Sequence, residues 1–244
     1  MPDIAASLHL QVLGTPIVRR SGDAAAAALL CEPRPLGLLI FLVTARPRGL
    51  HTRDSLLTLF WPDADLPHAR KGLRNALHAI RRATGHDLLV AAGHSMLGVN
   101  PIGVHCDLIQ FEEAAARGDC NGASMAPDAL LDGFHVVEAP TFDRWMEQER
   151  ARYRELLQRA LWQHAAQCVS HGDADAALVS AHRAQALDGT SERSLLRLIE
   201  LQCACGDRAA ALREYERFST RLRDDFETVP SAGTRAMVEQ LRLR

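Results

Sequence analysis

The chain has 244 residues, of which 47% are hydrophobic and 24% charged, a composition typical of a globular protein with one large domain or two modest ones. The longest apolar run, residues 36–43, is too short to span a bilayer, and no basic-then-apolar leader pattern opens the sequence. We therefore expect a cytoplasmic protein without a membrane partner. The six cysteines lack the spacing of a metal knuckle, so we expect reduced thiols and no metal site.

The net charge of −2 is spread unevenly along the chain. Residues 1–105 hold 11 Lys and Arg against 7 Asp and Glu, whereas residues 106–244 hold 17 against 23. A basic half joined to an acidic half is typical of a DNA-binding module fused to a protein-binding module. An imbalance of this size also arises by chance, so the charge pattern favours that interpretation without deciding it.

The first 105 residues predict a mixed domain of strands and helices. Thr52 predicts an N-cap, because its hydroxyl can accept from the free N–H groups of a first helical turn. Gly85 ends a helix that has Pro67 in its first turn. The predicted elements are, in chain order, two strands within 8–18, helices at 35–44, 52–60 and 67–84, and a hairpin of strands 88–91 and 95–99. This is the element order of a winged helix-turn-helix.

A repeat dominates the second half of the sequence, which predicts helices throughout. The segment Gly172-Asp173-x-x-Ala176-Ala177-Leu178 recurs as Gly206-Asp207-x-x-Ala210-Ala211-Leu212, an offset of 34 residues, which is the tetratricopeptide period. With each glycine at the turn between paired helices, Leu161 and Leu195 become equivalent core positions. We expect the flanking segments 142–153 and 231–241 to cap the stack.

The expected fold class is therefore mainly α. An N-terminal winged helix-turn-helix (α+β) occupies residues 1–105. An all-α, tetratricopeptide-like helical repeat domain occupies residues 106–244.

The predicted helix at 67–84 has an apolar face and a basic face. At 100° per residue, the apolar side chains and Thr84 fall on one stripe of the helix. The opposite side contains Lys71, Arg74, Asn75, His78 and Arg82, and Arg81 lies at its margin. The segment between residues 65 and 87 contains no Asp or Glu, whereas it contains five Lys or Arg and three His. Like charges three or four residues apart destabilise a helix unless an anion lies opposite them.

Double-stranded DNA supplies such an anion. A helix fits the major groove, where arginine can pair with guanine and asparagine with adenine, so Arg74 and Asn75 are candidate base readers. Lys71 and Arg82, nearer the helix ends, suit phosphates. The alternatives are a merely solvated basic face for the helix, a plain cap at Thr52 and a plain turn at the hairpin tip. The candidate DNA-binding residues are Thr52, Arg53, Arg70, Lys71, Arg74, Asn75, His78, Arg81, Arg82 and His94.

The sequence also resembles a known family. Phe60-Trp61-Pro62-Asp63 followed by Ala69-Arg70-x-x-Leu73-Arg74-x-x-Leu77-x-x-Ile80-Arg81-Arg82 is similar to the response-regulator-type winged helix of antibiotic regulatory proteins of the SARP/AfsR class. The second half resembles their bacterial transcriptional activator domain in Asp107-Leu-x-x-Phe111, Leu131-Asp-Gly-Phe134 and Phe142-Asp-x-Trp145. The resemblance implies a transcriptional activator that binds promoter repeats and contacts RNA polymerase. A homodimer is a second option for the partner of the helical domain.

Two features depart from that family pattern. Gly72 lies inside the candidate reading helix, where glycine costs about 1 kcal/mol relative to alanine; it either lets a phosphate approach or weakens the helix until DNA binds. The hairpin tip lacks Arg and Lys, which leaves minor-groove contact open. Trp145, with Glu149 and Arg150, predicts a core anchor beside a solvated edge or, alternatively, a partner-contact patch.

The chief competing function is a protein-interaction scaffold that does not bind DNA. An enzyme is not expected, because the sequence has no phosphate-binding loop, no zinc-protease motif and no nucleophile-elbow motif. We accordingly expect no catalytic residue and no cofactor.

Overall fold

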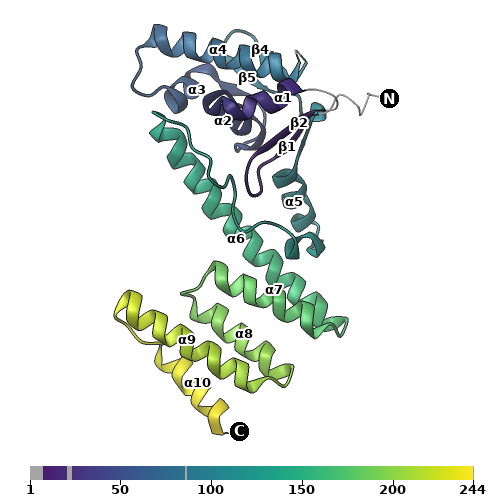
Figure 1. Ribbon diagram of the computed structural model, residues 1–244, viewed down its shortest axis with the longest axis vertical. Coiled ribbons are helices and arrows are strands. Elements are labelled where there is room, and N and C mark those ends of the chain that lie inside the picture. The colour runs from purple at the N-terminus through teal and green to yellow at the C-terminus, as the bar shows by residue number, and fades with distance from the viewer. Residues whose placement is uncertain (1–7, 21–23, 86, 244) are drawn as a thin grey trace. The chain divides into compact units, whose positions relative to one another are not determined.

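The computed structural model describes residues 8–20, 24–85 and 87–243. The chain forms two compact units: residues up to Ala114 with Pro127–Tyr153, and Ala115–Ala126 with the residues from Arg154 onward. The predicted fold class is confirmed, since a small region of strands and helices precedes an all-helical region (Figure 1).

A three-stranded sheet begins the first unit. Strand β1 (Leu8–Gln11) pairs antiparallel with β2 (Ile17–Arg20) and parallel with β6 (Val104–Cys106), giving the order β2-β1-β6. The two strands predicted within 8–18 are thus present. Leu8 and Leu10 are buried on one face, as the alternation of a strand requires.

The three predicted helices of the first unit are present as α2 (Pro33–Thr44), α3 (Arg53–Phe60) and α4 (Leu66–Thr84). Before them come α1 (Ala24–Ala28) and a 3₁₀ turn (Leu29–Cys31), which the sequence did not predict. The short strand β3 (His51–Thr52) joins the hairpin of β4 (Leu89–Ala92) and β5 (Met96–Val99) in a second sheet, of order β3-β5-β4. Helix α4 packs against α1, α2 and α3, so its inner face forms part of the core.

The start of the long helix α6 (Pro140–Ser170) belongs to the first unit. Phe142 is fully buried, with its ring centroid 4.7 Å from that of Phe60, and Trp145 packs edge-on against Phe41 at 4.9 Å. The expectation that residues 142–153 cap the repeat stack is therefore wrong. Their aromatic face is buried against helices that lie far away in the sequence.

Arg150 holds the loop that leads into α6. Its guanidinium donates to the backbone carbonyls of Leu130, Leu131 and Phe134 at 3.0, 2.6 and 3.1 Å. The prediction of a core anchor at Trp145 is confirmed. Arg150, in contrast, is not part of a solvated edge, because it satisfies carbonyls of a partly buried loop.

The helical unit contains the predicted repeat. The second half of α6 is followed by α7 (Ala174–Leu187), α8 (Glu192–Ala204), α9 (Arg208–Phe226) and α10 (Ala232–Leu243). Gly172 and Gly206 lie in the two equivalent turns with positive φ, where glycine has no Cβ penalty. Leu161 and Leu195 are both fully buried, as the 34-residue offset predicts.

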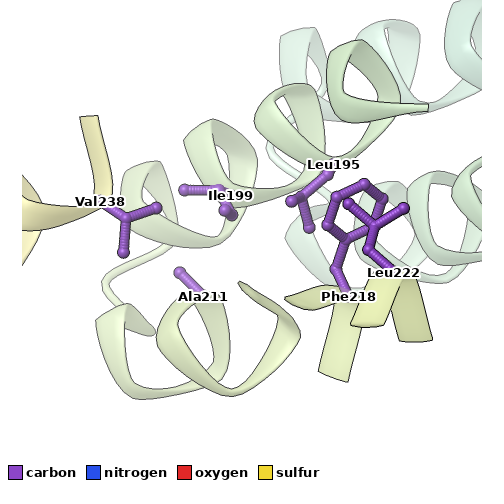
Figure 2. Packing of buried hydrophobic residues seen from close by; sticks show 6 residues of the cluster. All are labelled: Leu195, Ile199, Ala211, Phe218, Leu222 and Val238. Atoms are coloured by element: carbon purple, nitrogen blue, oxygen red, sulfur yellow. The ribbon is translucent and has the colours of Figure 1, made fainter. Parts of the chain in front are cut away.

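Side chains from three helices close the core at the end of this unit. Figure 2 shows Leu195 of α8 against Phe218 and Leu222 of α9, while Ile199 of α8 lies between Leu195 and Val238, with Ala211 nearby. Because Val238 belongs to α10, the prediction that residues 231–241 cover the end of the stack agrees with the packing.

The predicted boundary after residue 105 divides residues that the structure packs together, since 107–114 and 127–153 belong to the first unit. That residues 1–105 fold alone stays a prediction. Among the helices of the described residues, none is long and apolar enough to cross a membrane.

Candidate nucleic-acid interface

Helix α4 is amphipathic along its whole length. The predicted inner stripe is buried: Ala69, Leu73, Leu77, Ile80 and Thr84 all lie in the core. Burial of these side chains fixes the rotation of the helix about its axis, so the residues opposite them must face outward.

The first turn of α4 is closed by Asp65. Its carboxylate accepts from the backbone N–H of His68 at 2.9 Å and also contacts the imidazole Nδ1 at 2.7 Å. The backbone hydrogen bond, followed by the contact with the ring, holds the pKa of Asp65 below its usual value. The negative charge of Asp65 therefore lies at the first turn of α4, beside His68.

The outer face of α4 carries exposed cations along its central turns. Arg70, Lys71 and Arg74 are exposed, as are Asn75 and His78. Within the part of the chain that the structure describes, none of the three cations forms an ion pair. Of the residues predicted to share one outward face, Lys71, Arg74, Asn75 and His78 are thus exposed together, and among the described residues no ion pair neutralises Lys71 or Arg74.

Arg82 has a different environment from Lys71, the other residue predicted to contact phosphate. Its guanidinium pairs with Glu32 at 2.8 Å, and the two side chains are 61% and 39% exposed. An exposed pair of this kind contributes about 0–1 kcal/mol, so a phosphate can compete with Glu32 for it. Arg81 is half-buried and lies at the margin of the face, as expected.

The structure explains the glycine inside α4. A Cβ at position 72 would lie 2.5 Å from Nε1 of Trp61, far inside van der Waals contact. The Arg34 guanidinium covers the same indole at 5.5 Å from the ring centroid. Gly72 is needed so that Trp61 can pack against α4. This packing requirement accounts for the glycine without a phosphate or a weakened helix.

The start of α3 and the hairpin form a second group of candidate residues. Thr52 is the predicted cap, because its hydroxyl accepts from the backbone N–H of Ser55 at 3.1 Å. The backbone N–H of Arg53 donates to the carbonyl of Ser95 at 2.7 Å, which ties the start of α3 to the hairpin. His94 is exposed at the tip.

Two contributors to this surface were missed in the sequence. Glu32 could not be identified, because it lies 50 residues from Arg82 and nothing local links them. The packing of Trp61 did leave a signal, namely a glycine within an otherwise strong helix pattern shortly after a Trp-Pro pair.

Comparisons with known proteins show similarity to a family model and to a solved structure. The family model described as the bacterial transcriptional activator domain matches residues 106–242. Among solved structures, the chain is similar to Mycobacterium tuberculosis EmbR, solved in complex with a low-affinity phosphopeptide, with a TM-score of 0.65 and 22% identity. The alignment covers 96% of this chain but 64% of the EmbR chain, and it shows a shared fold. No curated protein matches the sequence.

Proposed function

This chain belongs to the family of the bacterial transcriptional activator domain, and we propose that it is a transcriptional regulator that binds double-stranded DNA through α4. One observation carries the proposal: Arg70, Lys71 and Arg74 are exposed on α4 and form no ion pair with any residue that the structure describes. A helix with its inner side buried in a rigid core can enter the major groove as a unit.

The roles of the residues follow from their positions. Arg74 and Asn75 lie in the middle of the exposed face, where side chains can reach base edges. Arg70 and Lys71 supply phosphate contacts, which fix the register of the helix on the duplex. Thr52, Arg53 and His94 form a second contact region beside the hairpin, while His78, Arg81 and Arg82 border the reading residues.

The helical unit is proposed as the protein-contact region. The family description supports an activator, and RNA polymerase is the partner that an activator has to reach; a second copy of the chain is the alternative. Deletion of residues 172–244 should abolish activation at a target promoter and leave operator binding detectable. Full activation by the shortened chain would refute this assignment.

DNA binding is tested by comparing two arginines of the whole protein. Arg74→Ala should lose about 1–3 kcal/mol of affinity for a selected duplex and should also lose discrimination against a scrambled duplex. Arg217→Ala removes the same charge from α9, where Arg217 pairs with Glu214 at 2.5 Å, and should leave both affinities unchanged. Both duplexes are titrated over a salt series. Equal affinities for wild type and Arg74→Ala would favour the scaffold function instead.

A further inference from the structure

The outer face of the β2-β1-β6 sheet carries a row of three basic side chains. His9 lies opposite Arg19 of β2 and beside His105 of β6 in the strand register. Their neighbours Leu8 and Leu10 are buried on the other face. Strand alternation therefore places all three basic residues outward, where each is exposed.

The two histidines form a stacked pair within this row. Their ring centroids are 5.1 Å apart and the ring planes differ by 22°. Together with the permanent charge of Arg19, the pair provides up to three positive charges on adjacent strands.

His9, Arg19 and His105 line a cavity of about 510 Å³. This volume is in the usual range for small-ligand sites. Gln11 and Gln110 add amide groups to its lining. The lining also includes Asp107, but this carboxylate accepts from the backbone N–H groups of Val12 and Leu13 at 2.9 and 3.0 Å. The acid is therefore committed to joining β1 to α5 (Asp107–Ala116).

We propose that this cavity binds the phosphate group of a small molecule. A guanidinium matches the geometry of phosphate oxygens. A protonated imidazole adds a positive charge and N–H donors for the same anion. The sheet floor and the side supplied by α5 favour a small ligand over a duplex, which needs an extended row of contacts. The proposal does not depend on DNA binding by α4.

The test measures binding of inorganic phosphate to the whole protein. Imidazole resonances are followed by NMR during a phosphate titration at constant ionic strength with chloride. Signals of His9 and His105 should shift in a saturable way, and those of His135, an exposed histidine of the same unit, should not. Equal shifts of all three signals would reduce the effect to general ion binding and overturn the proposal.

Variants locate the site. Arg19→Gln and His9→Gln should each weaken phosphate binding by about tenfold or more, the expected loss of one charge-assisted contact. Arg144→Gln removes an exposed arginine of the same unit and should change nothing. Unaltered phosphate affinity in both Arg19→Gln and His9→Gln would overturn the proposal.

The same variants separate this site from the DNA-binding surface. Arg19→Gln should retain duplex affinity, and Arg74→Ala should retain phosphate affinity. A loss of duplex affinity in Arg19→Gln as large as that in Arg74→Ala would make the row a contact for the DNA backbone and refute a small-molecule site. Phosphate binding that persists while Arg74→Ala leaves DNA affinity unchanged would refute the proposed function and support this site.

Discussion

Helices α4 and α9 are both 19 residues long, and each carries five Lys or Arg. Helix α9 also has four acids, and two of its cations have partners within the helical unit: Arg217 pairs with Glu214, and Arg221 donates to the carbonyl of Gly189 at 3.0 Å. Helix α4 has no acid in its span. The comparison teaches that the number of cations is a poor guide to function. The absence of intramolecular partners is the useful signal.

The comparison assumes that packing within the first unit holds α4 in place. A truncation of this unit tests that assumption. Residues 1–105 should be less stable than residues 1–153 by at least about 3–5 kcal/mol, the cost of losing one large buried aromatic, because the shorter fragment lacks Phe142. Urea denaturation measures the difference. Phe142→Ala in the longer fragment should reproduce most of the loss. Equal midpoints for the two fragments would show that residues 1–105 fold without the start of α6.

The inner face of α9 offers the corresponding test in the helical unit. Phe218→Ala should destabilise this unit by about 3–5 kcal/mol, because Phe218 is buried in the core shared by α8 and α9. Phe226→Ala is the matched control, since that side chain is 56% exposed at the end of the same helix. Duplex affinity should be unaffected by either change at a temperature where the first unit is folded. A large loss of affinity in Phe218→Ala alone would show that α9 supports α4.

The packing of Trp61 on α4 can be sharpened by one methyl group. Gly72→Ala gains about 1 kcal/mol of helix propensity but forces the indole away, and overpacking costs about 1–3 kcal/mol. We expect a small net loss of stability and a change in tryptophan fluorescence. Gly122→Ala is the control, because a Cβ there meets nothing within 4 Å. A more stable Gly72→Ala with unchanged fluorescence would show that Trp61 does not require the glycine.

Phosphate contacts distinguish the two helices through salt. Lys71→Ala should weaken binding to every duplex and lower the salt slope by about one unit. Arg213→Ala removes an exposed cation from α9 and should leave the slope unchanged. Equal slopes for wild type and Lys71→Ala would remove Lys71 from the interface.

The smallest effect concerns Arg82, which pairs with Glu32 at the end of α4. Glu32→Gln releases Arg82 and removes a nearby negative charge, so affinity for any duplex should rise by about two- to fivefold, corresponding to up to 1 kcal/mol. Glu113→Gln is the control, because it removes an exposed acid from α5 in the same unit. Unchanged affinity in Glu32→Gln would mean that Arg82 does not contact the duplex.

Features that act within one or two helical turns were determined by the sequence itself. The cap at Thr52, the end of α4 at Gly85 and the buried stripe through Leu73 and Leu77 depend on hydrogen bonds and side-chain periodicity within a few residues. The 34-residue repeat is equally readable, because each repeat has to bury the same positions. The mainly α fold follows from these local patterns.

Only the tertiary structure decided which distant segments meet. Phe142 lies in α6, the helix that continues into the repeats, yet its ring packs on Phe60. Arg82 pairs with an acid 50 residues away. The row of His9, Arg19 and His105 exists because β1 and β6, which lie far apart in the sequence, are paired in one sheet. Such contacts depend on the register and packing of whole elements. A local pattern fixes which face of an element is apolar, but the element that covers that face is selected by the complete core.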